Sequence, residues 1–306
     1  MHPALSIIAF TTLSGFGYGL AAVLGLGLLD ASAMSTKAAH ILALGLIAVG
    51  LMSSTLHLRN PQRAWRAISQ WRSSWLSREG LLAVLTFIPL IWSAWGAIIE
   101  SRYLPVPGLF GTVGAIATVF CTGMIYASLR SVQAWYTPQT PLCFLLFAGA
   151  GGLNLATLAA IFNAGDVYIL GLSAAAATAF AWIAKSAWRR RMLTAPPIST
   201  PETATGLAAI GRVRLWERPH SNENYLTREM GYRIARKHAE KLARISFTLG
   251  GAATVLLLLS TALFWATASS LAIIAAVVAV LCQTVGQFVE RWLFFAEARH
   301  AVMNYY

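Results

Sequence analysis

Eight long apolar segments constrain this chain more than any other feature of its sequence. They span residues 4–29, 39–58, 79–99, 108–129, 140–163, 167–188, 245–266 and 270–292. An α-helix rises about 1.5 Å per residue, so about 20 apolar residues cross the hydrocarbon core of a bilayer. The apolar stretches do not alternate with polar residues, which argues against a transmembrane barrel. We therefore predict an all-α, polytopic membrane protein with eight transmembrane helices, in which residues 1–306 form one membrane domain.

The composition supports this class and excludes a soluble enzyme. Hydrophobic residues make up 57% of the chain and charged residues only 11%, whereas a soluble domain carries roughly a quarter charged residues. The net charge of +12 would suggest nucleic acid in a soluble protein. Here the basic residues lie in the loops, where orientation signals and lipid headgroups account for them. We therefore expect the lipid bilayer as a partner and no nucleic acid.

The basic residues also predict an orientation. With eight spans, the N-terminus, the even-numbered loops and the C-terminus share one side, and 21 of the 23 Lys and Arg fall there. The other side has only Lys37 and Arg102. Because positive loops stay in the cytoplasm, we predict a multi-pass protein whose N- and C-termini are cytoplasmic.

Residues 189–244 are the longest connection and are predicted to form a cytoplasmic loop with two parts. Residues 194–206 are rich in Pro, Thr and Ala, which is typical of an extended, weakly structured linker. Residues 221–244 predict a basic amphipathic helix, with Ser221 or Asn222 as its N-cap. Such a helix can lie on anionic lipid or dock a partner subunit, and the sequence leaves both open.

Glycines are concentrated in the first apolar segment. Its GFGYG stretch resembles a dinucleotide-binding loop, but no strand precedes it. Gly15 and Gly19 are one helical turn apart, and small residues at this spacing let transmembrane helices approach closely. We therefore expect a helix contact here and not a nucleotide site.

Cysteine and histidine spacing argues against a metal centre in this chain. Cys121, Cys143 and Cys282 lie far apart in apolar segments, without a CxxC motif. A buried b-type haem needs facing histidine pairs, and His40 and His57 flank one predicted helix at opposite ends. We therefore expect no haem and no metal site.

The most informative segment is HLRNPQRAWRAISQWRSSWLSREG, from His57 to Gly80. It joins the inner ends of the second and third predicted helices and contains five arginines and three tryptophans. Tryptophan suits the headgroup level and arginine the inner face of a membrane. On composition alone, the segment could be only an interfacial belt.

His57 and Glu79 favour a more specific function for this segment. Both lie at the boundary between hydrocarbon and headgroups, on helices joined by one loop. A quinone needs a hydrogen-bond donor at a carbonyl and an ionisable group that leads to water, and histidine can donate and pass on a proton. Glu79 could relay protons to the aqueous side. Its alternative role is that of a first-turn acid favoured by the helix dipole, with Ser77 as cap.

Charges within the predicted helices would indicate an ion or proton path, and the sequence shows none away from a helix end. Gln283 and Gln287 share a helix face and are expected to hydrogen-bond to a neighbouring helix. This pattern argues against an ion-coupled transporter, although a transporter or a purely structural anchor remains open.

The opening MHPALSIIAFTTLSGFGYGL and the His57–Gly80 segment resemble the membrane anchor subunit of dimethyl sulfoxide reductase-type molybdoenzymes, the DmsC family. The resemblance spans most of the chain. It implies a complex with a molybdopterin catalytic subunit and an iron–sulfur subunit, while the anchor exchanges electrons with ubiquinone or menaquinone. The family's quinone-site histidine and glutamate fall on His57 and Glu79. Residues expected to surround this site or to dock a partner are His2, Arg59, Arg63, Trp65 and Arg78.

Two kinds of complex share such anchors. Dimethyl sulfoxide reductases face the periplasm and oxidise menaquinol, whereas cytoplasmic sulfite:quinone oxidoreductases pass electrons from sulfite to quinone. The His57–Gly80 segment shares its side with most basic residues, which favours the sulfite-oxidising type in a bacterial inner membrane. The iron–sulfur subunit would then dock on the cytoplasmic face.

Overall fold

A computed structural model of the protein describes residues 4–55, 60–214, 216–217, 222 and 234–305. These residues form helices and connecting turns. In chain order the elements are α1 (Leu5–Gly25), α2 (Met34–Thr55), η1 (Pro61–Gln70), α3 (Trp75–Ile98), α4 (Pro105–Ala127), α5 (Gln139–Ala159), η2 (Ala160–Ala164), α6 (Val167–Thr194), α7 (Pro201–Thr205), α9 (Ile234–Ser246), η3 (Phe247–Ala253), α10 (Thr254–Phe264), α11 (Ser269–Ala296) and η4 (Ala301–Asn304).

Eight helices in the described part of the chain are long and apolar enough to span a membrane. This confirms the predicted fold class. The seventh span, Lys237–Phe264, joins most of α9 to η3 and α10 without a break. The predicted ends hold to within a few residues, except that α6 continues to Thr194 and the seventh helix begins before residue 245.

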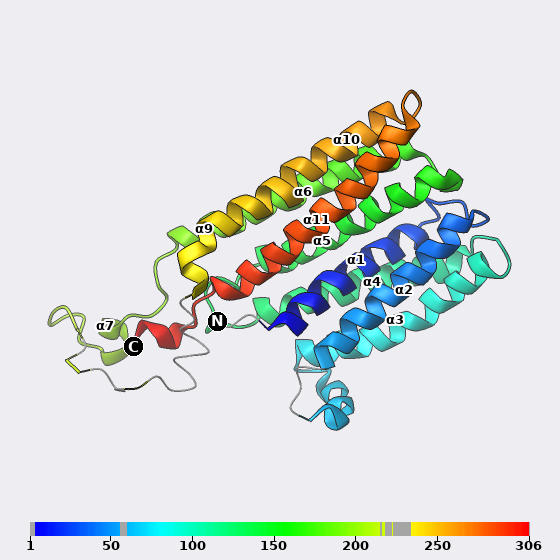
Figure 1. The fold of residues 1–306 in the computed structure, drawn as a ribbon. Helices are drawn as coiled ribbons and strands as arrows, with labels where there is room; N and C mark the ends of the chain where they lie inside the picture. The colour runs from blue at the N-terminus through cyan, green and yellow to red at the C-terminus, as the bar shows by residue number, and fades with distance from the viewer. Residues whose placement is uncertain (1–3, 56–59, 215, 218–221, 223–233, 306) are drawn as a thin grey trace.

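The helices form two groups that lie side by side (Figure 1). One group contains α1 to α4, and the other contains α5, α6, α10 and α11. The most deeply buried span is α1, which packs against α2, α4 and α5 and so joins the two groups.

Glycine makes this junction close, as the Gly15–Gly19 spacing predicts. A Cβ atom on Gly19 would overlap the carbonyl of Ala148 in α5, and one on Gly152 would overlap the backbone of Gly19. Gly15 is less constrained, because its Cβ would be in ordinary contact with Ala148 at 4.0 Å. The α1–α5 contact is therefore centred on Gly19 and Gly152, where two backbones touch.

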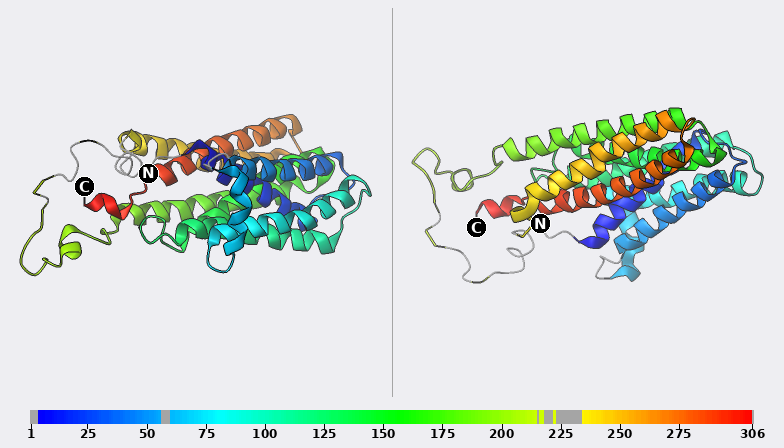
Figure 2. Two further views of the ribbon diagram at one scale, coloured as in Figure 1. Left: turned by 90° about the horizontal axis from the view of Figure 1, so that it is seen from below. Right: turned by 45° about the horizontal axis from the view of Figure 1, so that its top comes forward.

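One end of the bundle carries most of the basic residues and the longer connections, and we call it the basic end. There α2, α4, α6 and α11 finish, α3 and α5 begin, and the segment that contains α7 projects beyond the helices (Figures 1 and 2). The opposite end has short turns between α1 and α2, α3 and α4, and α10 and α11.

The predicted linker contains more structure than its composition suggests. Thr200 caps α7 through a reciprocal pair of hydrogen bonds with Thr203, and Gly206 ends it with a left-handed backbone. A capping box and a C-terminal glycine stabilise even a single helical turn. Of the predicted basic helix 221–244, residues 234–244 lie in α9 and Asn222 lies in a bend, while residue 221 and residues 223–233 are outside the described residues.

Candidate functional site

The buried face of α3 contains an acid one turn from the basic end. Glu79, Ala83, Thr86 and Leu90 are buried at spacings of four, three and four residues, which places them on one helix face. Thr86 meets Thr118 of α4 across this face at 3.4 Å. Glu79, only 5% exposed, therefore points into the bundle and not to lipid.

The start of α3 rules out the simpler role that the sequence allowed for Glu79. Ser74 is the N-cap, and its hydroxyl accepts a hydrogen bond from the Ser77 amide at 3.4 Å. The helix thus begins before Ser77, which is buried within it, so Ser77 as cap was wrong. Glu79 consequently lies beyond the first turn, where the free amides of a helix end no longer reach it.

Glu79 has no charged partner in the part of the chain that the structure describes. Within the described residues, neither a hydrogen bond nor an ion pair joins its carboxylate to another group. Its electrostatic neighbours are Tyr18 of α1 and Cys121 and Tyr126 of α4. A buried, unpaired carboxyl is costly to keep charged and can readily exchange a proton.

The two tyrosines supply hydroxyl donors that sequence reasoning missed. Tyr18 is buried beside Thr118, and its hydroxyl has no hydrogen-bond partner in the described structure. Tyr126 is partly buried and stacks on Phe144 with ring centroids 5.6 Å apart. Tyr126 lies in the last turn of α4, at the same end as Glu79, so its position was a usable signal. Tyr18 lies deep inside α1, and nothing local distinguishes it from a core residue.

Three of the predicted site residues lie outside the described residues: His2, His57 and Arg59. The described chain stops at Thr55 in α2 and resumes at Asn60 before η1. Both flanks are at the basic end, and α2 packs against α3. The distance between His57 and Glu79 therefore stays a prediction.

Arg78 forms hydrogen bonds that join the loop before α3 to the first turn of that helix. Its Nε donates to the carbonyl of Trp71 at 2.9 Å, and its Nη2 donates to the carbonyl of Arg72 at 2.7 Å. The guanidinium also lies 4.3 Å from the centroid of the Trp75 ring. These contacts commit two of the guanidinium nitrogens of Arg78 to the backbone of the loop.

Arg63 and Trp65 lie on η1 at the surface. Both are exposed, and Trp65 retains 67% of its accessible surface. The guanidinium of Arg66 stacks over the Trp65 ring at 5.5 Å. An exposed helix with paired arginine and tryptophan suits a headgroup region or a protein contact, so these residues belong to an outer surface and not to the surroundings of Glu79.

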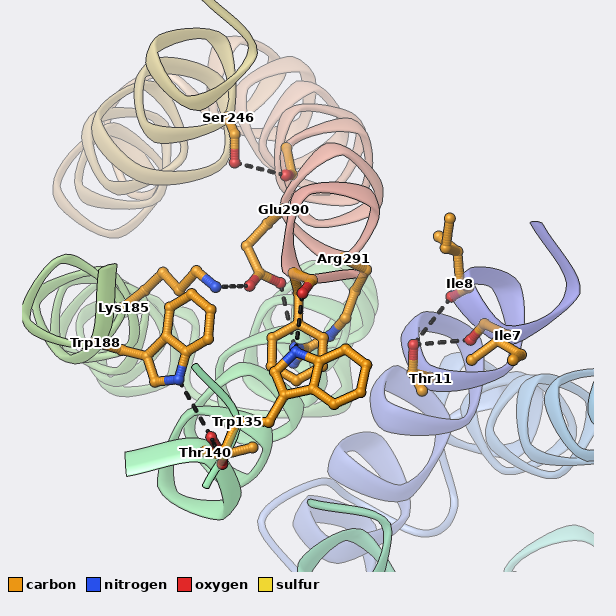
Figure 3. Close-up of polar contacts among 12 residues, drawn as sticks. Ile7, Ile8, Thr11, Trp135, Thr140, Lys185, Trp188, Ser246, Glu290 and Arg291 are labelled. Atoms are coloured by element: carbon orange, nitrogen blue, oxygen red, sulfur yellow. Dashed lines mark hydrogen bonds and ion pairs between the residues drawn. The ribbon is translucent and has the colours of Figure 1, made fainter. Parts of the chain in front are cut away.

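A second buried acid lies in the other helix group (Figure 3). The carboxylate of Glu290 in α11 forms ion pairs with Lys185 of α6 at 2.6 Å and with its chain neighbour Arg291 at 3.4 Å. All three side chains are at most 5% exposed. We call these three residues the buried ion cluster.

Aromatic rings enclose this cluster. Lys185 Nζ lies 3.6 Å from the centroid of Trp188, and the Arg291 guanidinium lies 3.9 Å from that of Phe144. Trp188 in turn donates to the hydroxyl of Thr140 at 3.2 Å. Cation–π contact and ion pairing together offset part of the cost of removing these charges from water.

The cluster corrects the expectation that charges would lie only at helix ends. We predicted ends at residues 188 and 292, but α6 runs to Thr194 and α11 to Ala296. Lys185, Glu290 and Arg291 therefore lie inside helices. Lys185 and Arg291 are buried in helices and are not loop residues. They therefore no longer belong to the 21 Lys and Arg from which the orientation was predicted.

The glutamine prediction is confirmed for Gln283. Its side-chain oxygen accepts from Asn154 of α5 at 2.6 Å. Gln287 is buried one turn further, and its side-chain oxygen has no hydrogen-bond partner in the described structure. Below it, at the basic end, Arg189 of α6 pairs with Glu297 at 3.0 Å.

Comparison with known proteins confirms the resemblance found in the sequence. A model of the family described as DMSO reductase anchor subunit (DmsC) matches residues 1–296. A relative from Allochromatium vinosum, the C subunit of a sulfite dehydrogenase, is 33% identical over 328 aligned positions. That alignment covers 100% of this chain and 99% of the relative. Both matches include the eight spans and the His57–Gly80 segment.

Proposed function

Because this chain belongs to the family of DMSO reductase anchor subunits, we propose that it binds quinone beside His57 and Glu79. The chain is a membrane subunit of an oxidoreductase complex, and catalytic and electron-transfer subunits are its partners. In the proposed complex the molybdopterin and iron–sulfur clusters belong to those partners.

The observation that carries the quinone proposal is that the buried carboxyl of Glu79 has no cationic partner among the described residues. A quinone supplies two carbonyl oxygens that take up protons on reduction. The surroundings of Glu79 fit such a group, because they combine a carboxyl free to exchange a proton with the hydroxyls of Tyr18 and Tyr126. We assign Glu79 to proton exchange with the aqueous side and His57 to hydrogen bonding of a carbonyl.

We propose that the complex passes electrons from sulfite to quinone. Sulfite would be oxidised to sulfate at the molybdenum centre of a partner, and its two electrons would travel along the iron–sulfur clusters to this chain. The support is the full-length similarity to a protein whose name assigns it to a sulfite dehydrogenase.

We further propose that the basic end faces the cytoplasm and receives the iron–sulfur subunit. At the opposite end Lys37 contacts Ser101 at 2.7 Å, and Arg102 pairs with Glu100 at 2.6 Å. Lys37 and Arg102 are the two basic residues of that end, against the many of the basic end, and this difference in number is the asymmetry that the positive-inside rule uses. The exposed η1, with Arg63 and Trp65, offers a docking surface beside α3.

A second candidate is the anchor of a periplasmic dimethyl sulfoxide reductase that oxidises menaquinol. The description of the matching family favours it. This function requires the basic end to face the periplasm, so labelling a cysteine introduced at exposed Gln62 with a membrane-impermeant reagent in intact cells separates the two.

The quinone site is tested on the purified complex with two electron acceptors. His57→Leu and Glu79→Gln should each lower sulfite-dependent quinone reduction by about a hundredfold, since general acid–base groups contribute at least this much. Reduction of a soluble dye by the partner subunits should not change. Glu100→Gln, an exposed acid at the opposite end, is the matched control. Wild-type quinone turnover in both variants would refute the site.

A further inference from the structure

At the basic end α6 and α9 separate and leave a cleft of about 350 Å³. Arg189 of α6 and Glu240 of α9 bridge it at 3.3 Å. The remaining lining is Ser186, Arg190, Leu193, Thr194, Ala243, Arg244 and Phe247. The cleft is thus bordered by arginines and by apolar or small side chains from both helices.

The charge of this cleft is positive. Among the described lining residues, three are arginines (Arg189, Arg190 and Arg244) and one is an acid, Glu240, while Glu297 binds Arg189 from the neighbouring cleft. Arg189 uses Nη2 for both Glu240 and Glu297, while its Nε is buried without a hydrogen-bond partner in the described structure. The cleft therefore has cationic donors in excess of its carboxylates, which suits an anion.

The exposed face of α6 changes from apolar to basic on approaching the cleft. Phe180 and Ile183 are each 62% exposed, and Arg190 and Thr194 continue the same face at helical spacing. The apolar part lies within a span that is long and apolar enough to cross a bilayer. It can only be covered by lipid chains or by another membrane protein.

The facing helix repeats this change. Arg244, Thr248, Ala252 and Leu256 are exposed at intervals of four residues along α9, η3 and α10. Arg244 lines the cleft, and Leu256, 64% exposed, lies further into the span. Both helices that border the cleft thus expose an arginine at the cleft and apolar side chains further into the span.

We propose that this cleft binds the phosphate of an anionic phospholipid, whose acyl chains lie on the exposed apolar faces of α6 and α10. Arginine forms paired hydrogen bonds to phosphate, and basic pockets between helices at the cytoplasmic boundary bind anionic headgroups. A neighbouring cleft of about 570 Å³ shares Arg189 and adds Arg191 and Arg299, which gives room for the rest of a headgroup.

A bilayer lipid fits better than a docked protein. The cleft continues into a face that lies within the membrane, so an occupant must combine one anionic group with long apolar chains. A soluble partner would leave Ile183 and Leu256 uncovered. Free inorganic phosphate would match the arginines but not the apolar part.

The test compares spin-labelled phosphatidylglycerol with spin-labelled phosphatidylcholine on the intact complex in phosphatidylcholine vesicles. The wild-type complex should prefer phosphatidylglycerol. In Arg190→Gln/Arg244→Gln this preference should fall about thirtyfold, since each arginine near a lipid surface contributes a factor of about five. Arg212→Gln/Arg214→Gln removes two exposed arginines of the same loop outside both clefts and should keep the preference.

Three results would overturn the proposal. One is an unchanged preference in Arg190→Gln/Arg244→Gln, and another is binding of inorganic phosphate by a wild-type complex that shows no preference for phosphatidylglycerol. The third is loss of partner subunits from this variant while its lipid preference stays intact, which would make the cleft a protein contact. If the variant does not assemble, Arg190→Lys/Arg244→Lys decides, because retained charge should keep most of the preference in a folded complex.

Discussion

Two buried glutamates at the same end of the bundle have opposite surroundings. Glu290 is held by Lys185 and Arg291 and enclosed by aromatic rings. Glu79 has neither an ion pair nor a hydrogen bond within the described structure, and its neighbours are tyrosine hydroxyls and a thiol. The first acid belongs to the α5–α6–α11 side, the second to the α1–α3–α4 side.

The contrast indicates that the charge of Glu290 stabilises the fold, whereas the carboxyl of Glu79 is available for chemistry. An ion pair in a low-dielectric interior is stable only while every member is present, because the remaining charge would be buried alone. A carboxyl without such a partner contributes little to folding and remains free to change its protonation state. Stability measurements on matched variants can test this division directly.

The largest expected effect is that of Glu290→Gln. It removes the only acid of the buried ion cluster and leaves Lys185 and Arg291 buried without a counter-charge. We expect the free energy of unfolding to fall by about 3–5 kcal/mol, measured by thermal unfolding of the detergent-solubilised complex. A loss below about 1 kcal/mol would mean that the cluster is not a structural pair.

A variant without charges sharpens this result. Lys185→Met/Glu290→Leu/Arg291→Met replaces the cluster by apolar side chains of similar size, which is often neutral or stabilising. Near wild-type stability in this variant would show that Glu290→Gln is harmful because it leaves unpaired charge. A loss as large as that of the single variant would instead assign the effect to packing among the rings.

For Arg78→Lys we expect a loss of unfolding free energy that is smaller than for Glu290→Gln and larger than for Glu79→Gln. Lysine keeps the charge but cannot donate to the carbonyls of Trp71 and Arg72 with the same fork geometry. We expect a loss of about 1 kcal/mol, measured in the same unfolding assay. Arg66→Lys is the control, since Arg66 stacks on an exposed tryptophan of η1; equal losses in the two variants would contradict a specific role of Arg78.

The smallest effect on stability is expected for Glu79→Gln. This substitution has the same chemistry as Glu290→Gln but removes no ion pair, so stability should change by less than about 0.5 kcal/mol or rise slightly. The unfolding assay that detects the Glu290 effect measures both. A loss of several kcal/mol would show that Glu79 has a structural partner after all.

The sequence was sufficient to predict the eight spans, because the thickness of a bilayer demands a length of apolar chain that few other structures use. It also predicted that Gly19 would allow a close helix contact and that Gln283 would bond to another helix. These predictions depend on composition and helical spacing within one segment. The partners, Ala148 and Asn154, are not visible in the sequence, since both lie in a different helix.

The buried ion cluster could not be predicted for the same reason. Hydropathy falls where Lys185 and Glu290 occur, so a sequence pattern ends the helices near those charges. In the structure the ion pair between Lys185 and Glu290 offsets part of the cost of burying each charge, and both helices continue past these residues. Likewise, Ser74 and Ser77 are equally good caps by type, and only the backbone of the loop decides between them.

The position of the cluster has a consequence for how the chain is made. Synthesis proceeds from the N-terminus, so α6 enters the membrane before α11 exists. Until then Lys185 lacks Glu290, its partner in the finished bundle, and its long side chain is expected to reach toward the headgroups. The last helix brings Glu290 and Arg291 to Lys185 and so completes the buried ion cluster. A chain that stops before α11 would keep Lys185 at the membrane without the acid that pairs with it in the finished bundle.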